Sequence, residues 1–342
     1  MRQQGETVDL VLEQRPDPIP GFGEATVRVH AVAVNRLDWL VRDGFGHAYN
    51  VRLPLIPGYD AAGEIVAVGP GDDSVHQGDR VYVHYDYSCG RCKACLEGED
   101  SLCSSYGLMG VDHDGGYAEL VVAPVRNLFA LGDNVTFDDA AAVGSVYLTA
   151  YHMLFSRGAL RAGETVLVSA AGSGVGGAAM QLAVWAGAQV IVTCGGPAKC
   201  ERALAYGADY AVDYSAPGWS EEVLRLTGGV GVDIAIDHIG AATFDEVLTC
   251  LAPRGRVVIC GATSGPRVEL DLIDLFARQI SIIGSSDGTR RELAEVLSLL
   301  DSGRISPVID SVLPLEQAGE AQRRLVDRDH FGRILLAPVN AA

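Results

Sequence analysis

Hydrophobic residues divide the chain into two regions with different patterns. Before Thr136, short apolar runs such as Ala25–Val34, Gly63–Val68 and Arg80–His84 are separated by turns rich in proline and glycine. Runs of this length between such residues predict β-strands joined by loops. We therefore expect the first region to be a β-rich domain.

Beyond Thr136 the pattern becomes a regular alternation of strands and helices. The segment 138–157 is rich in alanine and leucine and predicts a helix, with Thr136 or Asp138 as its N-terminal cap. The expected strands are Thr165–Ser169, Gln189–Thr193, Tyr210–Val212, Val232–Ile236, Arg256–Cys260 and Ile280–Ile283, and the expected helices between them are Gly176–Ala186, Ala198–Tyr206, Ser220–Leu226 and Phe244–Leu251. Strands that are apolar throughout and alternate with helices predict a parallel sheet covered on both faces.

The C-terminal part returns to a mixed pattern. It predicts a helix over Arg290–Asp301, a strand over Ser311–Leu313, a helix over Leu315–Val326 and a last strand over Arg333–Leu336. We expect this tail to join the first domain. The 342 residues then form two domains, with 1–135 and 287–342 in the β-rich domain and 136–286 in the parallel α/β domain.

Charge and composition exclude several classes of partner. The chain has 26 Lys and Arg residues against 44 Asp and Glu residues, a formal charge of -18. This balance argues against nucleic acids and anionic membranes as partners, because both bind basic surfaces. No basic segment followed by an apolar stretch opens the chain, and no long uninterrupted apolar run occurs, so we expect a cytoplasmic protein.

Four cysteines with the spacing C-x2-C-x2-C-x7-C are the strongest indication of a metal site. They are Cys89, Cys92, Cys95 and Cys103. Four thiolates on a short loop can bind one zinc ion tetrahedrally and leave no coordination position open, so this zinc would be structural. The alternative is a disulfide framework, which the length of the chain and the absence of a secretion signal disfavour. The remaining cysteines are expected to be small buried hydrophobic residues: Cys194, Cys200, Cys250 and Cys260.

A glycine-rich loop follows the first strand of the parallel sheet and precedes a helix. Gly172, Gly174 and Gly177 satisfy G-x-G-x-x-G, with Ser173 between the first two. In this context the motif predicts a dinucleotide site, because the backbone can approach the pyrophosphate closely and the helix N-terminus faces its charge.

The residues after the next strand favour NADPH over NADH. No acidic residue lies between Gly172 and Lys199, whereas an NAD-selective site uses a carboxylate about 20 residues past the glycines to bind the ribose 2′-hydroxyl. Gly195 and Gly196 form the turn, Lys199 offers a positive charge for a 2′-phosphate, and Tyr214 a hydroxyl. The alternative for Lys199 is a solvated helix residue.

With these motifs in this order, the chain resembles the medium-chain dehydrogenase/reductase superfamily over nearly its whole length. The resemblance rests on the cysteine loop, on Leu148-Thr149-Ala150-Tyr151 and on the segment 170–176. It implies an α/β protein with a GroES-like β-rich catalytic domain and a Rossmann domain whose sheet is doubly wound and parallel. It also implies an active site between the domains, and a homodimer or homotetramer built largely through the Rossmann sheets.

The chain departs from the alcohol dehydrogenases of this superfamily at each ligand of their catalytic zinc. Asn35 stands where they have a cysteine, Tyr59 where they have a histidine, with Asp60 at the place of the neighbouring glutamate, and Ser145 at the third ligand. An amide, a phenol and a hydroxyl do not hold zinc. We therefore expect one structural zinc per chain and no catalytic zinc.

The same segments resemble the quinone oxidoreductase and enoyl reductase branch, whose members prefer NADPH and use no catalytic metal. The segments are 34–38, followed by Arg42-Asp43-Gly44, and 195–199, where a serine often occupies the position of Gly196. The branch also implies cofactor contacts at Thr149, Val175, Ile239, Cys260 and Gly261.

Without a metal, hydride transfer to an activated C=C bond is the easier reaction, because hydrogen-bond donors can stabilise the enolate that forms. Tyr59 is the candidate donor; alternatively its ring is a wall of the pocket. Asn35 is expected to contact the nicotinamide or its ribose, or instead to cap its own turn. Asp38 is a candidate relay acid, with structural pairing to an arginine as the alternative.

Three functions remain open at this point. The first is an NADPH-dependent reductase of an α,β-unsaturated carbonyl or a quinone. The second is a carbonyl or alcohol oxidoreductase with an unusual metal site built from His47, Asp38 or Asp60. The third is an NADPH-binding protein without catalytic activity.

Overall fold

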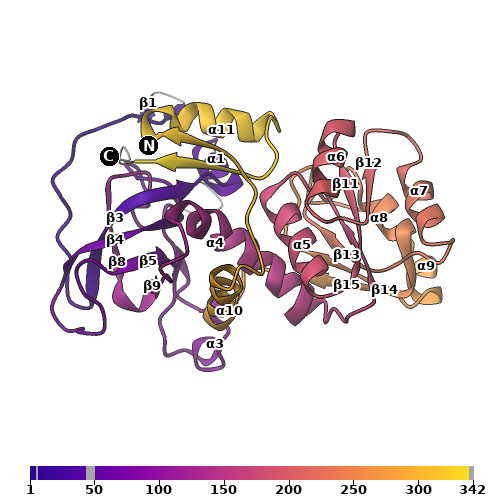
Figure 1. The fold of residues 1–342 in the computed structure, drawn as a ribbon, viewed down its shortest axis with the longest axis horizontal. Coiled ribbons are helices and arrows are strands. Elements are labelled where there is room, and N and C mark those ends of the chain that lie inside the picture. Colours follow the sequence, from indigo (N-terminus) through magenta and orange to yellow (C-terminus); the bar gives the residue numbers. More distant parts are fainter. Residues whose placement is uncertain (5–6, 44–50, 339–342) are drawn as a thin grey trace. The chain divides into compact units, whose positions relative to one another are not determined.

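The computed structural model describes residues 1–4, 7–43 and 51–338, and its chain separates into two compact units (Figure 1). Unit 1 comprises Met1–Gly144 and Leu293–Ala342, and unit 2 comprises Ser145–Glu292. The sequence placed these divisions at 136 and 287. Among the described residues, no helix has the length and apolar character needed to cross a membrane.

A mixed sheet forms the centre of unit 1. Its strands are β3 (Glu24–Ala33), β4 (Asp60–Val68), β5 (Arg80–Val83), β8 (Leu120–Pro124), β9 (Leu128–Ala130), β16 (Ile309–Pro314) and β17 (Arg333–Ala337). Within the described residues their order is β16-β17-β3-β4-β5-β9, and β8 also pairs with β3. Leu335 lies opposite Ala33 in this sheet, so the C-terminal strand joins the N-terminal ones as expected.

Helices and two small two-stranded sheets, β1-β2 and β6-β7, complete unit 1. They are β1 (Arg2–Gln4), β2 (Thr7–Asp9), α1 (Arg36–Arg42), β6 (Asp86–Tyr87), α3 (Lys93–Leu96), η1 (Asp100–Leu102), β7 (Gly107–Leu108), η2 (Val125–Asn127), α10 (Arg290–Asp301), η4 (Leu315–Gln317) and α11 (Ala318–Val326). The sequence analysis missed α1, because its seven residues are too few to show a helical period.

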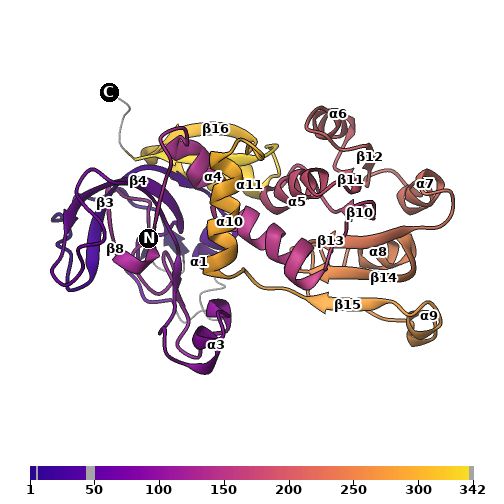
Figure 2. The same ribbon diagram turned by 60° about the horizontal axis from the view of Figure 1, so that its bottom comes forward.

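Unit 2 is built on a parallel sheet whose strands follow the order β12-β11-β10-β13-β14-β15 (Figure 2). The strands are β10 (Thr165–Val168), β11 (Gln189–Cys194), β12 (Tyr210–Asp213), β13 (Val232–Asp237), β14 (Leu251–Ile259) and β15 (Ser281–Gly284). All neighbouring pairs run parallel. The predicted parallel α/β domain is therefore confirmed.

Helices cover both faces of this sheet. They are α5 (Gly174–Trp185), α6 (Pro197–Ala205), α7 (Trp219–Leu226) and α8 (Phe244–Cys250). A further short helix, α9 (Leu272–Ala277), follows β14 and has no buried residue. On one face Leu167 and Ile191 pack in a core with Trp219 and Phe244. The alternate strand residue Val166 points to the opposite face and is also fully buried. Burial on both faces explains why the strands carry almost uninterrupted apolar sequences.

The helix that crosses the division between the units is broken by one glycine. α4 (Phe137–Tyr151) continues into the π-helix η3 (His152–Arg157), and Thr136 caps α4 by accepting a hydrogen bond from Asp139 N at 3.0 Å. Gly144 has the non-helical angles φ 2 and ψ -122. A Cβ atom at Gly144 would lie 2.4 Å from Asp60 Oδ1, so a side chain there would collide with a buried carboxylate.

Candidate active site and metal centre

The glycine-rich loop lies between the end of β10 and the start of α5. Ser173 is the N-cap of α5, and its Oγ accepts a hydrogen bond from Gly176 N at 3.0 Å. A Cβ atom at Gly176 would lie 2.3 Å from the carbonyl oxygen of Ala170. The helix can therefore approach the strand only because Gly176 has no side chain, a requirement that the spacing G-x-G-x-x-G did not identify.

Two buried polar atoms without a protein partner lie at the end of β13, the strand next to β10. Asp237 is fully buried; its Oδ2 accepts a hydrogen bond from Gly240 N at 3.0 Å, and its Oδ1 has no partner. The next residue, His238, is 8% exposed; its Nε2 lies 2.9 Å from Ser173 Oγ, and its Nδ1 has no partner. The sequence analysis included neither side chain.

The loop between β11 and α6 holds the predicted specificity residues. Gly196, at φ 94, precedes Pro197 at the start of α6, and a Cβ atom on Gly195 would lie 2.8 Å from the hydroxyl of Tyr214. Asp213 at the end of β12 accepts hydrogen bonds from Gly196 N at 3.0 Å and Ser215 N at 2.9 Å. The sequence analysis missed this carboxylate because it searched only the segment directly after β11.

The other predicted cofactor residues are distributed as follows: Gly172 in the turn after β10, Gly174, Val175 and Gly177 in the first turns of α5, Thr149 on α4, Lys199 on α6, Ile239 after β13, and Cys260 and Gly261 after β14. Apart from Thr149 and Lys199, these residues lie at or directly after the carboxyl ends of strands, or in the turn that leads into α5, which is where open α/β sheets bind ligands. Their contacts to a cofactor stay predictions.

These features fit a dinucleotide. The start of α5 offers a pyrophosphate the positive end of the helix dipole and the N–H groups of a helix N-terminus, apart from Gly176 N, which is bonded to Ser173 Oγ. The strand order reverses between β10 and β13, which is the position where a dinucleotide crosses such a sheet. The partnerless Nδ1 of His238 at that position is a buried polar group that a ligand would satisfy.

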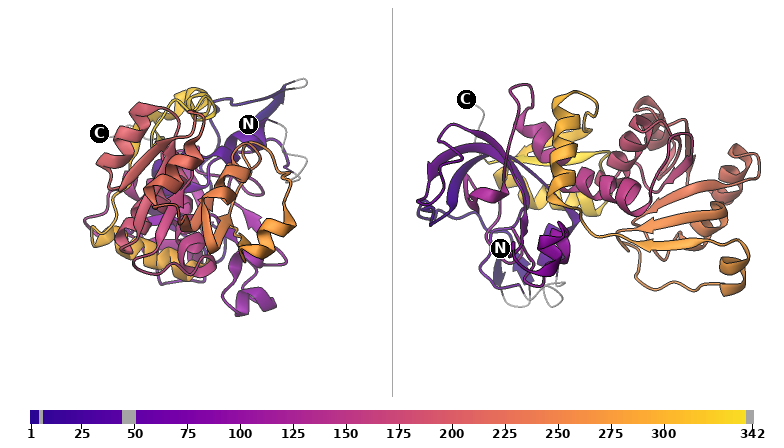
Figure 3. Two further views of the ribbon diagram at one scale, coloured as in Figure 1. Left: turned by 90° about the vertical axis from the view of Figure 1, so that its right-hand side faces the viewer. Right: turned by 90° about the horizontal axis from the view of Figure 1, so that it is seen from below.

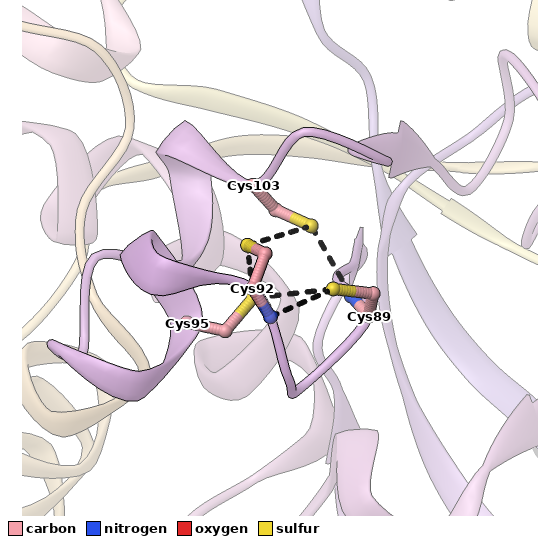
Figure 4. A group of neighbouring side chains, drawn as sticks. All are labelled: Cys89, Cys92, Cys95 and Cys103. Carbon is pink, nitrogen blue, oxygen red and sulfur yellow. Dashed lines mark hydrogen bonds between the residues drawn. The ribbon is translucent and has the colours of Figure 1, made fainter.

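The four cysteines of the predicted metal site converge on one point (Figure 4). Their sulfur atoms lie within 4.8 Å of one another. The Sγ–Sγ distances are 3.9 Å for Cys89–Cys95, 3.5 Å for Cys92–Cys95 and 3.9 Å for Cys92–Cys103. Four sulfurs around a zinc ion at about 2.3 Å form a tetrahedron with edges of about 3.8 Å. The donor set and its dimensions therefore fit zinc, and all four cysteines are free rather than disulfide-bonded.

Three backbone N–H groups support two of these thiolates. Cys92 N donates to Cys89 Sγ at 3.3 Å, Cys89 N to Cys103 Sγ at 3.2 Å, and Ser105 N to the same sulfur at 3.3 Å. Hydrogen bonds of this kind fix metal ligands in position. Of the other four cysteines, Cys194 and Cys250 are buried as expected, whereas Cys200 and Cys260 are partly exposed.

In unit 1, Asn35 belongs to a buried network rather than to an open position. Its Oδ1 accepts from Arg333 Nη1 at 2.9 Å, and its Nδ2 donates to Asp60 Oδ2 at 2.9 Å. Arg333 Nη2 also bonds Asp60 Oδ2 at 2.9 Å, and Tyr82 donates to Asp60 Oδ1 at 2.9 Å. Asn35 is 4% exposed and stands at the N-cap of α1, while its amide bonds Asp60 and Arg333. Its contact to the nicotinamide or the ribose stays a prediction.

Asp38, the candidate relay acid, has no arginine partner among the contacts described. Its Oδ2 accepts from Asn35 N at 2.8 Å and from the Tyr117 hydroxyl at 3.1 Å, and its Oδ1 accepts from Gly58 N at 3.1 Å. The alternative for Asp38, structural pairing with an arginine, is therefore wrong, because Arg333 pairs with Asp60 instead. Burial raises the pKa of Asp38 to about 7.

Tyr59 lies directly before β4, next to this network. It is half-buried, and its ring meets that of Tyr85 edge-on, with centroids 5.1 Å apart. The neighbouring Tyr82 and Tyr117 are buried, and burial raises the pKa of both hydroxyls well above the usual value. Tyr59 is thus the most exposed of the tyrosines around this network. Ser145, at the expected third ligand position, is 4% exposed.

Comparison with known proteins identifies both units. The alcohol dehydrogenase GroES-like domain family matches residues 21–133, and the zinc-binding dehydrogenase family matches residues 174–302. Human quinone oxidoreductase is 30% identical over 92% of this chain and 90% of its own length. This chain belongs to the medium-chain dehydrogenase/reductase superfamily. Unit 1 is its GroES-like domain and unit 2 its Rossmann domain.

Other similar members of the superfamily are named for different activities. Acryloyl-coenzyme A reductase of Sulfurisphaera tokodaii is 30% identical over 96% of each chain. The crystal structure of an NAD-dependent alcohol dehydrogenase superposes with a TM-score of 0.92 at 43% identity, covering 96% of this chain and 95% of that one. The chain is therefore an oxidoreductase of this superfamily, and sequence similarity alone does not separate alcohol oxidation from alkene reduction.

The possible metal-ligating side chains of this medium-chain dehydrogenase/reductase are the four cysteines and the residues considered for an unusual metal site. Among the described residues, the cysteine cluster is the group of His, Cys, Asp and Glu side chains that converges closely enough for a metal ion. The two carboxylates considered as unusual ligands, Asp38 and Asp60, are already bonded to protein donors. His47, the remaining candidate, lies outside the described residues.

The raised pKa of Asp38 predicts a specific pH dependence of stability. The pKa of aspartate in an unfolded chain is about 3.9, so the folded state favours protonated Asp38. Between about pH 4 and pH 7, ionisation of Asp38 therefore lowers the unfolding free energy, by ~4 kcal/mol in total. The unfolding free energy should therefore fall as the pH rises through this window. In Asp38→Asn the fall should be smaller by about this amount; denaturant titrations between pH 4 and 8 measure it.

Glu292 provides an internal reference for this experiment. Hydrogen bonds from His152 and Ser156 outweigh the effect of burial and lower the pKa of Glu292 to about 2. Its stabilising contribution is lost as the pH falls from about 4.5 towards 2, which overlaps only the lower end of the window of Asp38. An identical pH slope in wild type and Asp38→Asn between pH 4 and 8 would contradict the assignment.

Proposed function

We propose that this protein is an NADPH-dependent reductase that transfers hydride to an activated C=C bond of an α,β-unsaturated carbonyl compound or a quinone, without a catalytic metal. The contacts of Asn35 are the main support. The amide stands where the alcohol dehydrogenases have a zinc-ligating cysteine, and both ends of it are bonded to Asp60 and Arg333. A side chain used in this way supports the polypeptide and not a metal.

The dinucleotide, when bound, supplies the hydride. The chain's own residues must orient the substrate and stabilise the negative charge that develops on its carbonyl oxygen. For an alkene conjugated to a carbonyl, this charge spreads into an enolate, and preorganised hydrogen-bond donors suffice to stabilise it. We propose the Tyr59 hydroxyl as this donor, because Tyr59 is the half-buried member of a group of otherwise buried tyrosines.

The preference for NADPH rests on the loop between β11 and α6. Lys199 lies on the first turns of α6, and Tyr214 is adjacent to Gly195. Asp213 acts in the opposite direction, because its carboxylate at Gly196 N would repel a 2′-phosphate. NADH is therefore the second candidate cofactor, which the name of the NAD-dependent relative also favours.

An alcohol or carbonyl dehydrogenase is the second candidate function. Relatives named alcohol dehydrogenase favour it. It would need a catalytic metal, and Asp38 or Asp60 could bind one only by giving up the hydrogen bonds of a buried network.

A turnover screen combined with metal analysis tests the proposal. Purified protein is offered NADPH or NADH with enones, quinones and aldehydes, and the oxidised cofactors with alcohols. The proposal predicts reduction of enones or quinones with about one zinc per chain. Alcohol oxidation with two metal ions per chain would favour the dehydrogenase. Binding of NADPH without turnover of any substrate would indicate a protein that has lost catalysis.

The Tyr59→Phe substitution tests the proposed donor. Loss of one preorganised donor to a developing oxyanion typically lowers kcat by ~100- to 1,000-fold. We expect a decrease of this size with the enone or quinone that the screen identifies, and little change in dinucleotide affinity. Tyr210→Phe, at a tyrosine that is 38% exposed on β12, is the matched control and should keep full activity. Unchanged turnover in Tyr59→Phe would make Tyr59 a wall of the pocket.

We also propose that the protein is a homo-oligomer formed through the edge of the Rossmann sheet. β15 is the last strand in that order (Figure 3, right, orange). Its residue Ile282 is exposed. Ile273 and Phe276 on the neighbouring α9 are each 69% exposed. An open apolar edge is normally covered, and a second copy of the strand would cover it. Ile282→Lys should shift the mass measured by light scattering towards the 36.1 kDa monomer.

A further inference from the structure

The strand order places His238 at the centre of the dinucleotide site. β10, which leads into the glycine loop, is flanked by β11 on one side and β13 on the other. The half of the sheet from β10 to β12 receives the adenosine end of a dinucleotide in this fold, so β13 begins the nicotinamide half. His238 directly follows β13, and its Nε2 reaches across to Ser173 at 2.9 Å.

The two nitrogens of His238 have different surroundings. Nε2 is bound to Ser173 Oγ, the same atom that accepts the N-cap hydrogen bond from Gly176 N. Nδ1 is buried and has no protein partner. Burial lowers the pKa of His238, so the imidazole is neutral near pH 7 and one of its nitrogens carries the proton. An unpaired buried polar atom of this kind is unfavourable, and a bound ligand can supply the missing hydrogen bond.

We propose that His238 is a positioning residue for the cofactor: Nε2 fixes the Ser173 turn of the glycine loop, and Nδ1 binds a hydroxyl of the nicotinamide-side ribose. A hydroxyl suits this atom because it can both donate and accept, so it complements either tautomer of the neutral ring. The proposal rests on the dinucleotide part of the proposed function and is independent of substrate and metal.

Two substitutions separate the roles of the two nitrogens. The amide nitrogen of glutamine can replace Nε2 but not Nδ1, so His238→Gln keeps a group facing Ser173 and loses the ribose contact. Asparagine places its amide near the position of Nδ1, so His238→Asn retains the ribose contact and loses the contact to Ser173. The melting temperature of the cofactor-free variants shows whether either change damages the fold.

Two ligands decide between a ribose contact and a merely structural role: the complete dinucleotide (the whole ligand) and its adenosine half alone (the half ligand). Affinities are measured calorimetrically for NADP⁺ and adenosine 2′,5′-bisphosphate, or for NAD⁺ and AMP if the protein prefers NAD. His238→Gln should weaken the whole dinucleotide roughly three- to tenfold, the effect of one lost hydrogen bond, and change the half ligand less than twofold. His238→Asn should bind the whole dinucleotide more tightly than His238→Gln does.

Two results would overturn the proposal. Equal weakening of whole and half ligand would mean that His238 only supports the glycine loop, and no weakening would mean that Nδ1 does not contact the cofactor. If the variants do not fold, the wild type labelled with ¹⁵N-histidine serves instead. The Nδ1 resonance of His238 should then shift with the whole dinucleotide and not with the half ligand, and an unchanged resonance contradicts the proposal. A protein that binds dinucleotide but reduces no enone would refute the proposed reaction and leave this test valid.

Discussion

Replacing Cys103 by serine should reduce the zinc content from about one ion per chain to nearly none and open the loop 89–103. Structural zinc sites contribute ~10–16 kcal/mol of binding free energy in small domains, because the site does not exist in the unfolded chain. Between Cys89 and Cys103 the chain forms α3 (Lys93–Leu96) and η1 (Asp100–Leu102), elements of four and three residues that cannot persist in isolation. An ion bound by the four sulfur atoms would therefore hold this segment together.

Metal analysis and limited proteolysis measure this effect. We expect Cys103→Ser, and wild type treated with a chelator, to be cleaved within 89–103 and to melt at a lower temperature. Cys200→Ser, at a partly exposed cysteine on α6, is the control and should keep its zinc. Because the glycine loop belongs to unit 2, folded Cys103→Ser should still bind dinucleotide. A variant that retains one zinc per chain would show that the ion binds elsewhere.

Elements with a clear local pattern could be predicted from the sequence. Helix α10 begins and ends as expected, at Arg290 and Asp301, because its apolar positions follow a helical period. The parallel strands could be predicted because burial on both faces demands apolar residues throughout. Helix α9 was missed, since its exposed Ile273 and Phe276 give no amphipathic period.

The candidate site was predictable where one motif carries its own geometry and not where distant residues meet. The cysteine spacing places all four ligands on one loop, and the glycine loop is a single strand-to-helix connection. The partners of Asn35 are different: Arg333 lies 298 residues away along the chain, and no local pattern relates the two. His238 was missed for the same reason, because its bond to Ser173 spans 65 residues.

The buried ion pair between Arg333 and Asp60 should be among the most sensitive points of unit 1. Asp60 is fully buried, and Arg333 is 5% exposed. Removing one partner of such a pair leaves an uncompensated charge in the interior and costs about 3–5 kcal/mol. We therefore expect Arg333→Met to lower the unfolding free energy by this amount at pH 8.

A double-mutant cycle identifies the interaction that is lost. Arg333→Met combined with Asp60→Asn removes both charges and should recover part of the stability, because no charge is left unpaired. Arg323→Met is the matched control. Its guanidinium pairs with Glu320 and Asp327 at the surface, where the side chain is 58% exposed, so its loss should have little effect on stability. If Arg333→Met is no more destabilising than this control, Asp60 and Asn35 are held by Tyr82 and the backbone, and the ion pair does not fix the position of Asn35.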